Sequence, residues 1–280
     1  MPRNLVIMVL DSCRFDSFQR AHTPNLDRIG GAEKRWSYAS WTAPSHYTFF
    51  MGLVPHRAPQ HVYASEVYKE DFGAWSQRLN IPDLNFGSFI PQLSLAKMLK
   101  GIGYKTIGRV SMPVLNSYTL VSKYFDDYQL MTNHFDFQGI VDSVEFASDQ
   151  PTFCFFNIGE THYPYMLEGD DLPHISGLHG VAKALAAGDD AGGKITKGND
   201  RTFDDLMKDD TMTRLHDQQV RCVETVDRIV EELFEKAPED TYFIVMADHG
   251  DCFGEGGYFG HGPVMHEKVF EVPFLEGMRP

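Results

Sequence analysis

Long hydrophobic runs are absent from this sequence of 280 residues. The apolar run nearest the N-terminus, Leu5–Leu10, is far shorter than the ~20 residues that span a bilayer. It is also too short to be the apolar region of a signal peptide followed by a cleavage site. We therefore expect a soluble, cytoplasmic protein with no membrane partner.

Cysteine is scarce, and its spacing suggests no pairing. The chain has four cysteines that lie far apart, at positions Cys13, Cys154, Cys222 and Cys252. Scattered single cysteines favour free thiols in a reducing compartment over a disulfide framework. This agrees with a cytoplasmic protein.

Basic residues are fewer than acidic residues in this sequence. The chain has 25 Lys and Arg against 39 Asp and Glu, which gives a formal net charge of −14. Nucleic acids and anionic membranes are bound through basic surfaces, so we exclude them as partners recognised by charge. A phosphorylated substrate would need a metal ion or a local cationic pocket. The hydrophobic content of 42% and charged content of 23% are ordinary for a globular protein and exclude disorder of the whole chain.

Apolar segments and helical patterns alternate along the chain. Four segments predict strands buried on both faces of a sheet: Leu5–Leu10, Lys105–Val110, Thr152–Ile158 and Thr241–Ala247. Apolar residues three and four apart predict helices over Ser94–Ile102 and from about Thr211 to Lys236. This alternation predicts one α/β domain over residues 1–280, with a doubly wound, mostly parallel sheet and helices on both faces.

Residues 167–210 interrupt this pattern. They are rich in Gly, Asp and Lys and show little periodicity. A structureless loop of this length is uncommon inside a compact domain. We expect a lid over the functional site or a mobile insertion.

Polar residues follow three of the predicted strands. Asp11 follows the first, Glu160 and His162 follow the third, and Asp248 and His249 follow the fourth. Ligands bind outside the carboxyl ends of parallel strands, so these side chains should gather at one edge of the sheet. Because buried carboxylates repel one another, their convergence favours a metal site. The alternative is that the two aspartates only cap the helices that follow them.

Several motifs occur in the order expected for one superfamily. The segment 248–262, Asp-His-Gly-Asp-Cys-Phe-Gly-Glu-Gly-Gly-Tyr-Phe-Gly-His-Gly, followed by Val-Pro-Phe at 272–274, resembles the C-terminal signature of the alkaline phosphatase superfamily, in its sulfatase-like branch. Further resemblances are Asp-Ser-Cys-Arg at 11–14, Thr-Pro-Asn-Leu-Asp at 23–27, Trp-Thr-Ala-Pro-Ser-His at 41–46 and Leu-Lys-Gly-Ile-Gly-Tyr-Lys-Thr at 99–106. The branch includes sulfatases, phosphonate monoester hydrolases and phosphoethanolamine transferases. The resemblance implies an alkaline phosphatase-like fold.

The resemblance also implies roles for individual residues. Thr42 would be the nucleophile, and Asp11, Asp248 and His249 would bind a metal ion, with the Thr42 oxygen completing the shell. A threonine hydroxyl is a poor nucleophile unless a metal or base lowers its pKa, so the two roles fit each other. Two Asp and one His suit Zn²⁺ or Mn²⁺, and a shell richer in oxygen would suit Ca²⁺. A helix starting at Pro44 would present its amino end to an anion. The alternative role of Thr42 is a helix cap.

The nucleophile motif departs from that of sulfatases. Those enzymes carry Cys or Ser, oxidised to formylglycine, followed by Pro-Ser-Arg. Thr42 cannot form that aldehyde, and His46 stands in place of the arginine. The departure favours phosphoryl transfer through a phosphothreonine over sulfate ester hydrolysis. His46 is either the replacement anion ligand or a histidine on the helix surface.

Four further residues have roles by resemblance or by charge. His162, in a His-x-Pro motif, resembles the histidine that binds the anion or protonates the leaving group. His261 resembles a ligand of the second ion in two-zinc members. Those members also use an Asp and a His four residues apart, where this sequence offers Glu160 and His162, only two apart, so we leave this second site open. Arg14 could bind phosphate oxygens, or it could pair with a carboxylate such as Asp16.

These features predict a metal-dependent phosphoesterase that hydrolyses a small-molecule phosphomonoester or phosphodiester through a phosphothreonine. The alternatives are a phosphoryl-group transferase, a hydrolase of sulfate esters or phosphonates, and a non-catalytic binder of a phosphorylated ligand. The chain ends soon after 272–274, so we expect the C-terminal sulfatase subdomain to be lacking. Residues 57–92, which include Trp75, Arg78 and several other aromatic residues, would then wall the substrate pocket together with residues 167–210. A homo-oligomer is left open.

Overall fold

The computed structural model describes residues 2–59, 61–84, 86–89, 93–165, 167, 182–183, 207 and 209–280. The lid expected at 167–210 lies almost entirely outside these residues.

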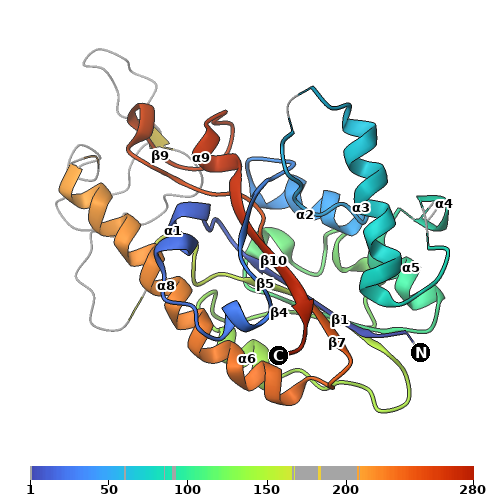
Figure 1. Ribbon diagram of the computed structural model, residues 1–280. Coiled ribbons are helices and arrows are strands. Elements are labelled where there is room, and N and C mark those ends of the chain that lie inside the picture. Colours follow the sequence, from blue (N-terminus) through green and yellow to red (C-terminus); the bar gives the residue numbers. More distant parts are fainter. Residues whose placement is uncertain are drawn as a thin grey trace.

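A seven-stranded sheet forms the centre of the molecule (Figure 1). Its strand order is β2-β10-β7-β1-β5-β3-β4. The strands are β1 (Asn4–Leu10), β2 (Glu33–Trp36), β3 (Lys105–Val110), β4 (Asp127–Leu130), β5 (Thr152–Ile158), β7 (Thr241–Ala247) and β10 (Glu271–Met278). The run from β7 to β4 is parallel, whereas β10 is antiparallel to both β7 and β2. The predicted mostly parallel sheet is confirmed, and all four predicted strands belong to it. A smaller antiparallel sheet contains β6 (Ala182–Lys183), β9 (Tyr258–Gly260) and β8 (Cys252–Phe253).

Helices cover both faces of the large sheet (Figure 1). They are α1 (Phe15–Arg20), α2 (Thr42–Phe50), α3 (Ala64–Leu79), α4 (Phe86–Phe89), α5 (Leu95–Gly101), α6 (Phe137–Asp142), α8 (Asp209–Lys236) and α9 (Glu267–Phe270). Apolar side chains of α1, α6 and α8 share one core cluster, and those of α2, α3 and α5 share the other. The doubly wound α/β architecture is therefore confirmed.

The central strand β1 shows why its sequence is continuously apolar. Successive side chains of a strand point to opposite faces. Val6, Met8 and Leu10 therefore pack in the cluster with α8, and Leu5, Ile7 and Val9 pack in the cluster with α2 and α3. All seven residues of β1 are buried, as in a strand covered on both faces.

The longest helix is α8, which begins two residues before the predicted Thr211 and ends at the predicted Lys236. Its apolar face, which includes Val223, Val226 and Val230, is buried against the sheet. None of the described helices is both long enough and apolar enough to cross a membrane. All four cysteines are buried and free, as predicted.

The expectation that residues 57–92 line the substrate pocket is wrong for Trp75 and Arg78. Trp75 is fully buried in the core, and its Nε1–H donates to the carbonyl of Gly52 at 2.7 Å. Arg78 is buried beside it and forms an ion pair with Glu276 at 2.5 Å. Both side chains stabilise the packing of α3 and are not available to a substrate.

Candidate active site

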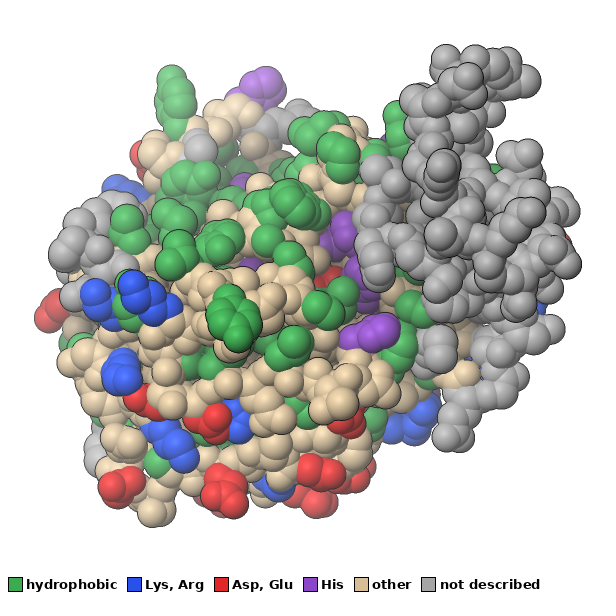
Figure 2. Space-filling model, turned by 180° about the vertical axis from the view of Figure 1, so that it is seen from behind, with side chains coloured by type: hydrophobic (Ala, Val, Ile, Leu, Met, Phe, Trp, Pro, Cys, Tyr) green, Lys and Arg blue, Asp and Glu red, His purple; other side chains and the backbone are tan. Residues whose placement is uncertain are grey.

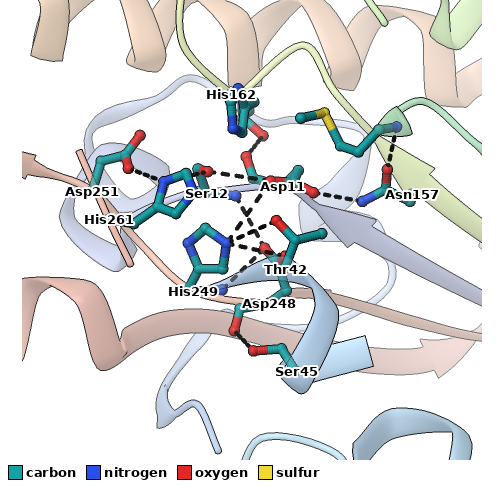
Figure 3. Close-up of polar contacts among 12 residues, drawn as sticks. Asp11, Ser12, Thr42, Ser45, Asn157, His162, Asp248, His249, Asp251 and His261 are labelled. Carbon is teal, nitrogen blue, oxygen red and sulfur yellow. Dashed lines mark hydrogen bonds and ion pairs between the residues drawn. The ribbon is translucent and has the colours of Figure 1, made fainter. Parts of the chain in front are cut away.

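Side chains from the ends of β1 and β7 and from the start of α2 meet at the carboxyl edge of the large sheet (Figure 3). Asp11 directly follows β1, and Asp248 and His249 directly follow β7. The two strands are parallel neighbours, with Leu10 paired to Ala247, so both loops leave the sheet at the same place. Helix α2 brings Thr42 to these residues.

Asp11, Asp248 and His249 form a group that fits a divalent cation. One ligand atom from each lies within 4.8 Å of the other two, and all three side chains are fully buried. Asp248 Oδ1 accepts backbone N–H bonds from Ser12 and His249, each at 3.0 Å. Asp248 Oδ2 accepts no hydrogen bond, although it is buried. A buried carboxylate oxygen without a donor, next to a second carboxylate and an imidazole, is the donor set that Zn²⁺ or Mn²⁺ prefers.

The charges of this group are strongly coupled. Burial alone would lower the pKa of His249, but the Asp248 and Asp11 carboxylates raise that pKa to about 9. Burial disfavours the charged form of Asp248, yet His249 lowers the pKa of Asp248 below its usual range. Nε2 of His249 lies 3.3 Å from Asp248 Oδ2. Without a metal, the imidazolium therefore supplies the positive charge that the carboxylates require.

Thr42 lies beside this group. Its Oγ1 is 3.3 Å from His249 Nε2. Thr42 is the first residue of α2, so the helix begins two residues before the predicted Pro44. The residue at the N-cap position is Trp41, and it makes no side-chain capping bond. Thr42 is therefore not the N-cap residue of α2, and the capping role considered for it is wrong. Its hydroxyl faces the predicted metal ligands.

A second group of candidate ligands contains His249, Asp251 and His261, again with ligand atoms within 4.8 Å of one another. Asp251 Oδ1 lies 2.7 Å from His261 Nδ1, and the hydroxyl of Tyr165 donates to Asp251 Oδ2 at 2.6 Å. The two groups share His249, whose Nδ1 lies 3.1 Å from the carbonyl of Gly250 and is therefore its donor. Only Nε2 remains as a ligand, and one nitrogen cannot serve two ions. This sharing favours a single complete metal site.

Glu160 does not belong to either group. Its Oε1 accepts the N–H of Phe137 at 2.6 Å, so the side chain points to the amino end of α6. Burial raises the pKa of Glu160 to about 7. The role of Glu160 as a companion of His261 is therefore corrected. Asp251 takes the place next to His261, because the turn after β7 carries it there.

His162 lies close to the second group, with its ring centroid 5.3 Å from that of His261. Its Nδ1 is 2.6 Å from the carbonyl of Tyr163, which fixes Nδ1 as the protonated nitrogen. Nε2 of a neutral His162 is therefore the nitrogen left to accept a proton. Its role toward a substrate stays a prediction.

The substrate-binding role predicted for Arg14 is not supported. The guanidinium is buried and forms ion pairs with Asp16 and Glu255, each at 2.6 Å. Its Nη1 also donates to the carbonyl of Asp251 at 3.3 Å, and the group lies over the ring of Phe253. The donors of Arg14 are thus used inside the protein, and the alternative pairing with Asp16 is the one observed.

His46 is fully buried, so it is not the helix-surface histidine considered for it, and its role as an anion ligand stays a prediction. Its Nδ1 lies 2.8 Å from the Thr42 carbonyl, one helical turn earlier. Burial lowers the pKa of His46, which favours the neutral ring.

Sequence reasoning missed three residues of this site. Ser12 donates its N–H to Asp248 from a left-handed conformation with φ 62°. Asp251 stands three residues after Asp248, in the segment that carried the resemblance. Asn157 donates to Asp11 Oδ2 at 2.7 Å. The sequence does single out Asn157 in one respect, because it is an amide near the end of a mostly apolar strand.

Figure 2 shows several histidine side chains close together on one face of the molecule, bordered by hydrophobic side chains. The lysines and arginines on this face lie mostly away from the histidines (Figure 2).

Comparisons with known proteins identify the family and the fold of this chain. The sequence model of the family described as Sulfatase matches residues 3–276. No curated protein matches the sequence. The fold is similar to the zinc complex of the C-terminal periplasmic domain of EcEptC from Escherichia coli, with a TM-score of 0.58, 14% identity and coverage of 99% of this chain and 73% of that one. It is also similar to the same domain of the phosphoethanolamine transferase EptC from Campylobacter jejuni, with a TM-score of 0.57, 13% identity and coverage of 99% and 79%.

A 2-O GAG sulfatase has the same fold, with a TM-score of 0.58, 12% identity and coverage of 99% of this chain and 64% of that one. At these identities, the similarity to solved structures shows the fold alone. The family match covers nearly the whole chain, and it confirms the resemblance seen in the motifs. This chain belongs to the sulfatase family, in the sulfatase-like branch of the alkaline phosphatase superfamily.

Proposed function

We propose that this chain is a metal-dependent phosphoesterase that acts through a phosphothreonine on Thr42. The observation that carries the proposal is the position of the Thr42 hydroxyl, 3.3 Å from Nε2 of His249 in a buried group of metal-ligating side chains. Family membership supports a hydrolase or a transferase in general. The phosphate ester and the phosphothreonine are the specific part of the proposal.

Asp11, Asp248 and His249 would hold the metal ion. Zinc is favoured by the donor set, manganese is the second choice, and calcium would need more oxygen ligands. Such an ion supplies positive charge that favours the ionised form of a nearby hydroxyl and of a transferring anion. Two buried carboxylates next to one imidazole carry net negative charge, which a dication would offset.

Thr42 would attack phosphorus, and the bond from phosphorus to the leaving alcohol would break. The first backbone N–H groups of α2 have no carbonyl acceptor within the helix, so they can receive phosphoryl oxygens. The hydroxyl proton of Thr42 would pass to water as its oxygen attacks. A His162 protonated on both ring nitrogens would give its Nε2 proton to the leaving oxygen and would then be reprotonated from water. Water would then release phosphate from Thr42 and restore the free hydroxyl.

The nucleophile decides between phosphate and sulfate in this proposal. Formylglycine cleaves sulfate esters through an aldehyde hydrate, and threonine cannot be converted into that group. A threonine ester of phosphate can be hydrolysed by water, as the cycle requires. We therefore propose phosphate esters as the substrates, in preference to sulfate esters and phosphonates.

A second candidate is transfer of the phosphoryl group to an acceptor alcohol. The similarity in fold to two EptC domains, one of them in complex with zinc and the other a phosphoethanolamine transferase, favours this candidate. The same intermediate on Thr42 would serve, with the acceptor in the place of water.

The test is a panel of small-molecule phosphomonoesters, phosphodiesters, sulfate esters and phosphonates, each with Zn²⁺ and with Mn²⁺. We expect phosphate release from a phosphate ester, and a phosphorylated Thr42 peptide in acid-quenched enzyme by mass spectrometry. Added alcohols that divert the product from phosphate to a new ester would identify the transferase. Cleavage of sulfate esters alone would contradict the proposal.

A further inference from the structure

Asn157 is a fully buried amide near the carboxyl end of β5. Its Oδ1 accepts the backbone N–H of Ser111 at 3.2 Å and of Met112 at 3.0 Å. Two donors at one atom identify it as the oxygen, so the orientation of the amide is fixed. Nδ2 therefore points the other way, where it donates to Asp11 Oδ2 at 2.7 Å (Figure 3).

His46 continues this chain of contacts. The Thr42 carbonyl can only accept, so Nδ1 of His46, at 2.8 Å, carries the proton. In the neutral ring Nε2 is then an acceptor, and it lies 3.4 Å from Nδ2 of Asn157. The ring also packs near Phe49 and Phe155, with centroids 5.4 Å and 5.6 Å away. The ring is fully buried, and its two nitrogens lie next to the Thr42 carbonyl and Asn157.

We propose that Asn157 and His46 are positioning residues that join the Asp11 carboxylate to the first turn of α2. The contacts run from Asp11 to Asn157, from Asn157 to His46, and from His46 to the carbonyl of Thr42. This chain, which we call the Asn157–His46 relay, lets one amide orient a predicted metal ligand and the predicted nucleophile together.

The relay accounts for two features of the site. Asn157 engages Oδ2 of Asp11, which leaves Oδ1 on the side of His249, 4.0 Å from Nε2. His46 bonds the carbonyl of Thr42 rather than its hydroxyl, so Oγ1 remains free to face His249. Partners that orient metal ligands in this way commonly change metal affinity or activity 10–100-fold when removed.

Zinc affinity of the metal-free, full-length protein gives the first test. Competition with a chromophoric chelator measures binding of Zn²⁺ alone, without any substrate. We expect Asn157→Leu to weaken zinc binding about 10–100-fold. If this variant does not fold, Asn157→Ser leaves room for water and should weaken zinc binding in the same direction.

Asn4→Leu is the matched control. Asn4 is also a buried strand asparagine, with Nδ2 bonded to Asp240 at 3.0 Å and Oδ1 accepting the N–H of Thr152 at 2.7 Å. It lies at the opposite end of the sheet, so its loss should lower the Tm and leave zinc affinity unchanged. Zinc affinity that is the same in Asn157→Leu and wild type, with a Tm loss like that of Asn4→Leu, would overturn the relay.

His46→Asn separates positioning from anion binding. The asparagine keeps a donor near the Thr42 carbonyl and lacks the nitrogen that faces Asn157. With para-nitrophenyl phosphate as substrate, we expect kcat to fall about 10-fold or more with KM little changed, together with weaker zinc binding. A raised KM with unchanged kcat and zinc affinity would instead make His46 an anion ligand. In the double variant Asn157→Leu/His46→Asn, the loss of zinc affinity should be smaller than the sum of the two single losses, because both changes break one chain of contacts.

The effect on turnover rests on the proposed function, whereas the effect on zinc affinity does not. A wild-type protein that binds zinc and cleaves no phosphate ester would contradict the proposed function, and the zinc comparison would still decide the relay. A wild-type protein that binds neither Zn²⁺ nor Mn²⁺ would overturn both.

Discussion

The hydroxyl of Thr42 lies 3.3 Å from Nε2 of His249, although 207 positions separate the two residues in the chain. A second contact fixes the same juxtaposition, because the Ser45 hydroxyl on α2 donates to the carbonyl of Asp248 at 2.9 Å (Figure 3). The predicted nucleophile is thus held against the predicted ligand loop by bonds within the protein.

Thr42→Ala should lower kcat by several orders of magnitude, because it removes the nucleophile and leaves the ligands of the ion in place. Thr42→Ser keeps a hydroxyl and should keep substantial activity. Steady-state kinetics and zinc analysis measure both effects. Thr48→Ala, on the same helix, removes only a bond to the Ser45 carbonyl and should leave turnover unchanged. Turnover of Thr42→Ala near that of wild type would mean that water attacks the ester directly.

Chelation should abolish turnover, and Zn²⁺ or Mn²⁺ should restore it. Asp248→Asn should weaken zinc binding about 10-fold or more, because the ion loses a full negative charge at contact distance. We expect one zinc per chain by elemental analysis, since His249 can serve only one ion. Two ions bound with similar affinity would contradict the single site.

Zinc binding should release a proton at neutral pH. His249 has a pKa of about 9 without metal, so it is protonated at pH 7 and must lose that proton to become a ligand. Apparent zinc affinity should therefore fall about 10-fold per unit as pH decreases below about 9. The heat of zinc binding, measured by calorimetry in buffers of different ionisation enthalpy, gives the number of protons released. A binding heat that does not depend on the buffer would refute this.

The same pKa affects the stability of the metal-free protein. The pKa of His249 is raised in the folded state from an ordinary 6.5 to about 9. Its contribution is therefore full below about pH 6.5 and is lost as pH rises through about 9. The Tm of metal-free protein should drop over this range, and His249→Gln should remove most of that dependence.

Glu160→Gln should stabilise the protein at pH 8 and leave zinc affinity unchanged. The folded-state pKa of Glu160 is raised by burial from 4.5 to about 7, so its favourable contribution is present below 4.5 and lost as pH rises through 7. At pH 8 the wild type holds a buried charge whose Oε2 has no hydrogen-bond partner. Denaturant unfolding at pH 5 and pH 8 measures the difference. Weaker zinc binding in this variant would show that Glu160 is a zinc ligand.

Arg14→Met should destabilise the protein without raising KM. Removing the guanidinium leaves Glu255 without its arginine partner and Asp16 with only the longer ion pairs to His216 and Lys268, each at 3.6 Å. The expected cost is about 2–3 kcal/mol, below that of a fully buried pair because both carboxylates are 30% exposed. Denaturant unfolding and steady-state kinetics test the two parts. A KM raised 10-fold or more in a stably folded variant would show that Arg14 reaches the substrate.

The sequence by itself determined the sheet and the family. Strands such as Leu5–Leu10 are apolar without interruption because both faces are covered, and this pattern is readable without coordinates. The carboxyl-end rule also places Asp11, Asp248 and His249 at one edge, since each directly follows a strand.

Only the tertiary structure decided what each polar side chain faces. Glu160 and Asp251 both stand within a few residues of a strand end, yet one points to α6 and the other pairs with His261. Arg14 carries the chemistry of an anion ligand, but it is buried and its guanidinium pairs with carboxylates inside the protein. The direction of a side chain depends on loop conformation and on partners far away in the chain, which local sequence patterns do not encode.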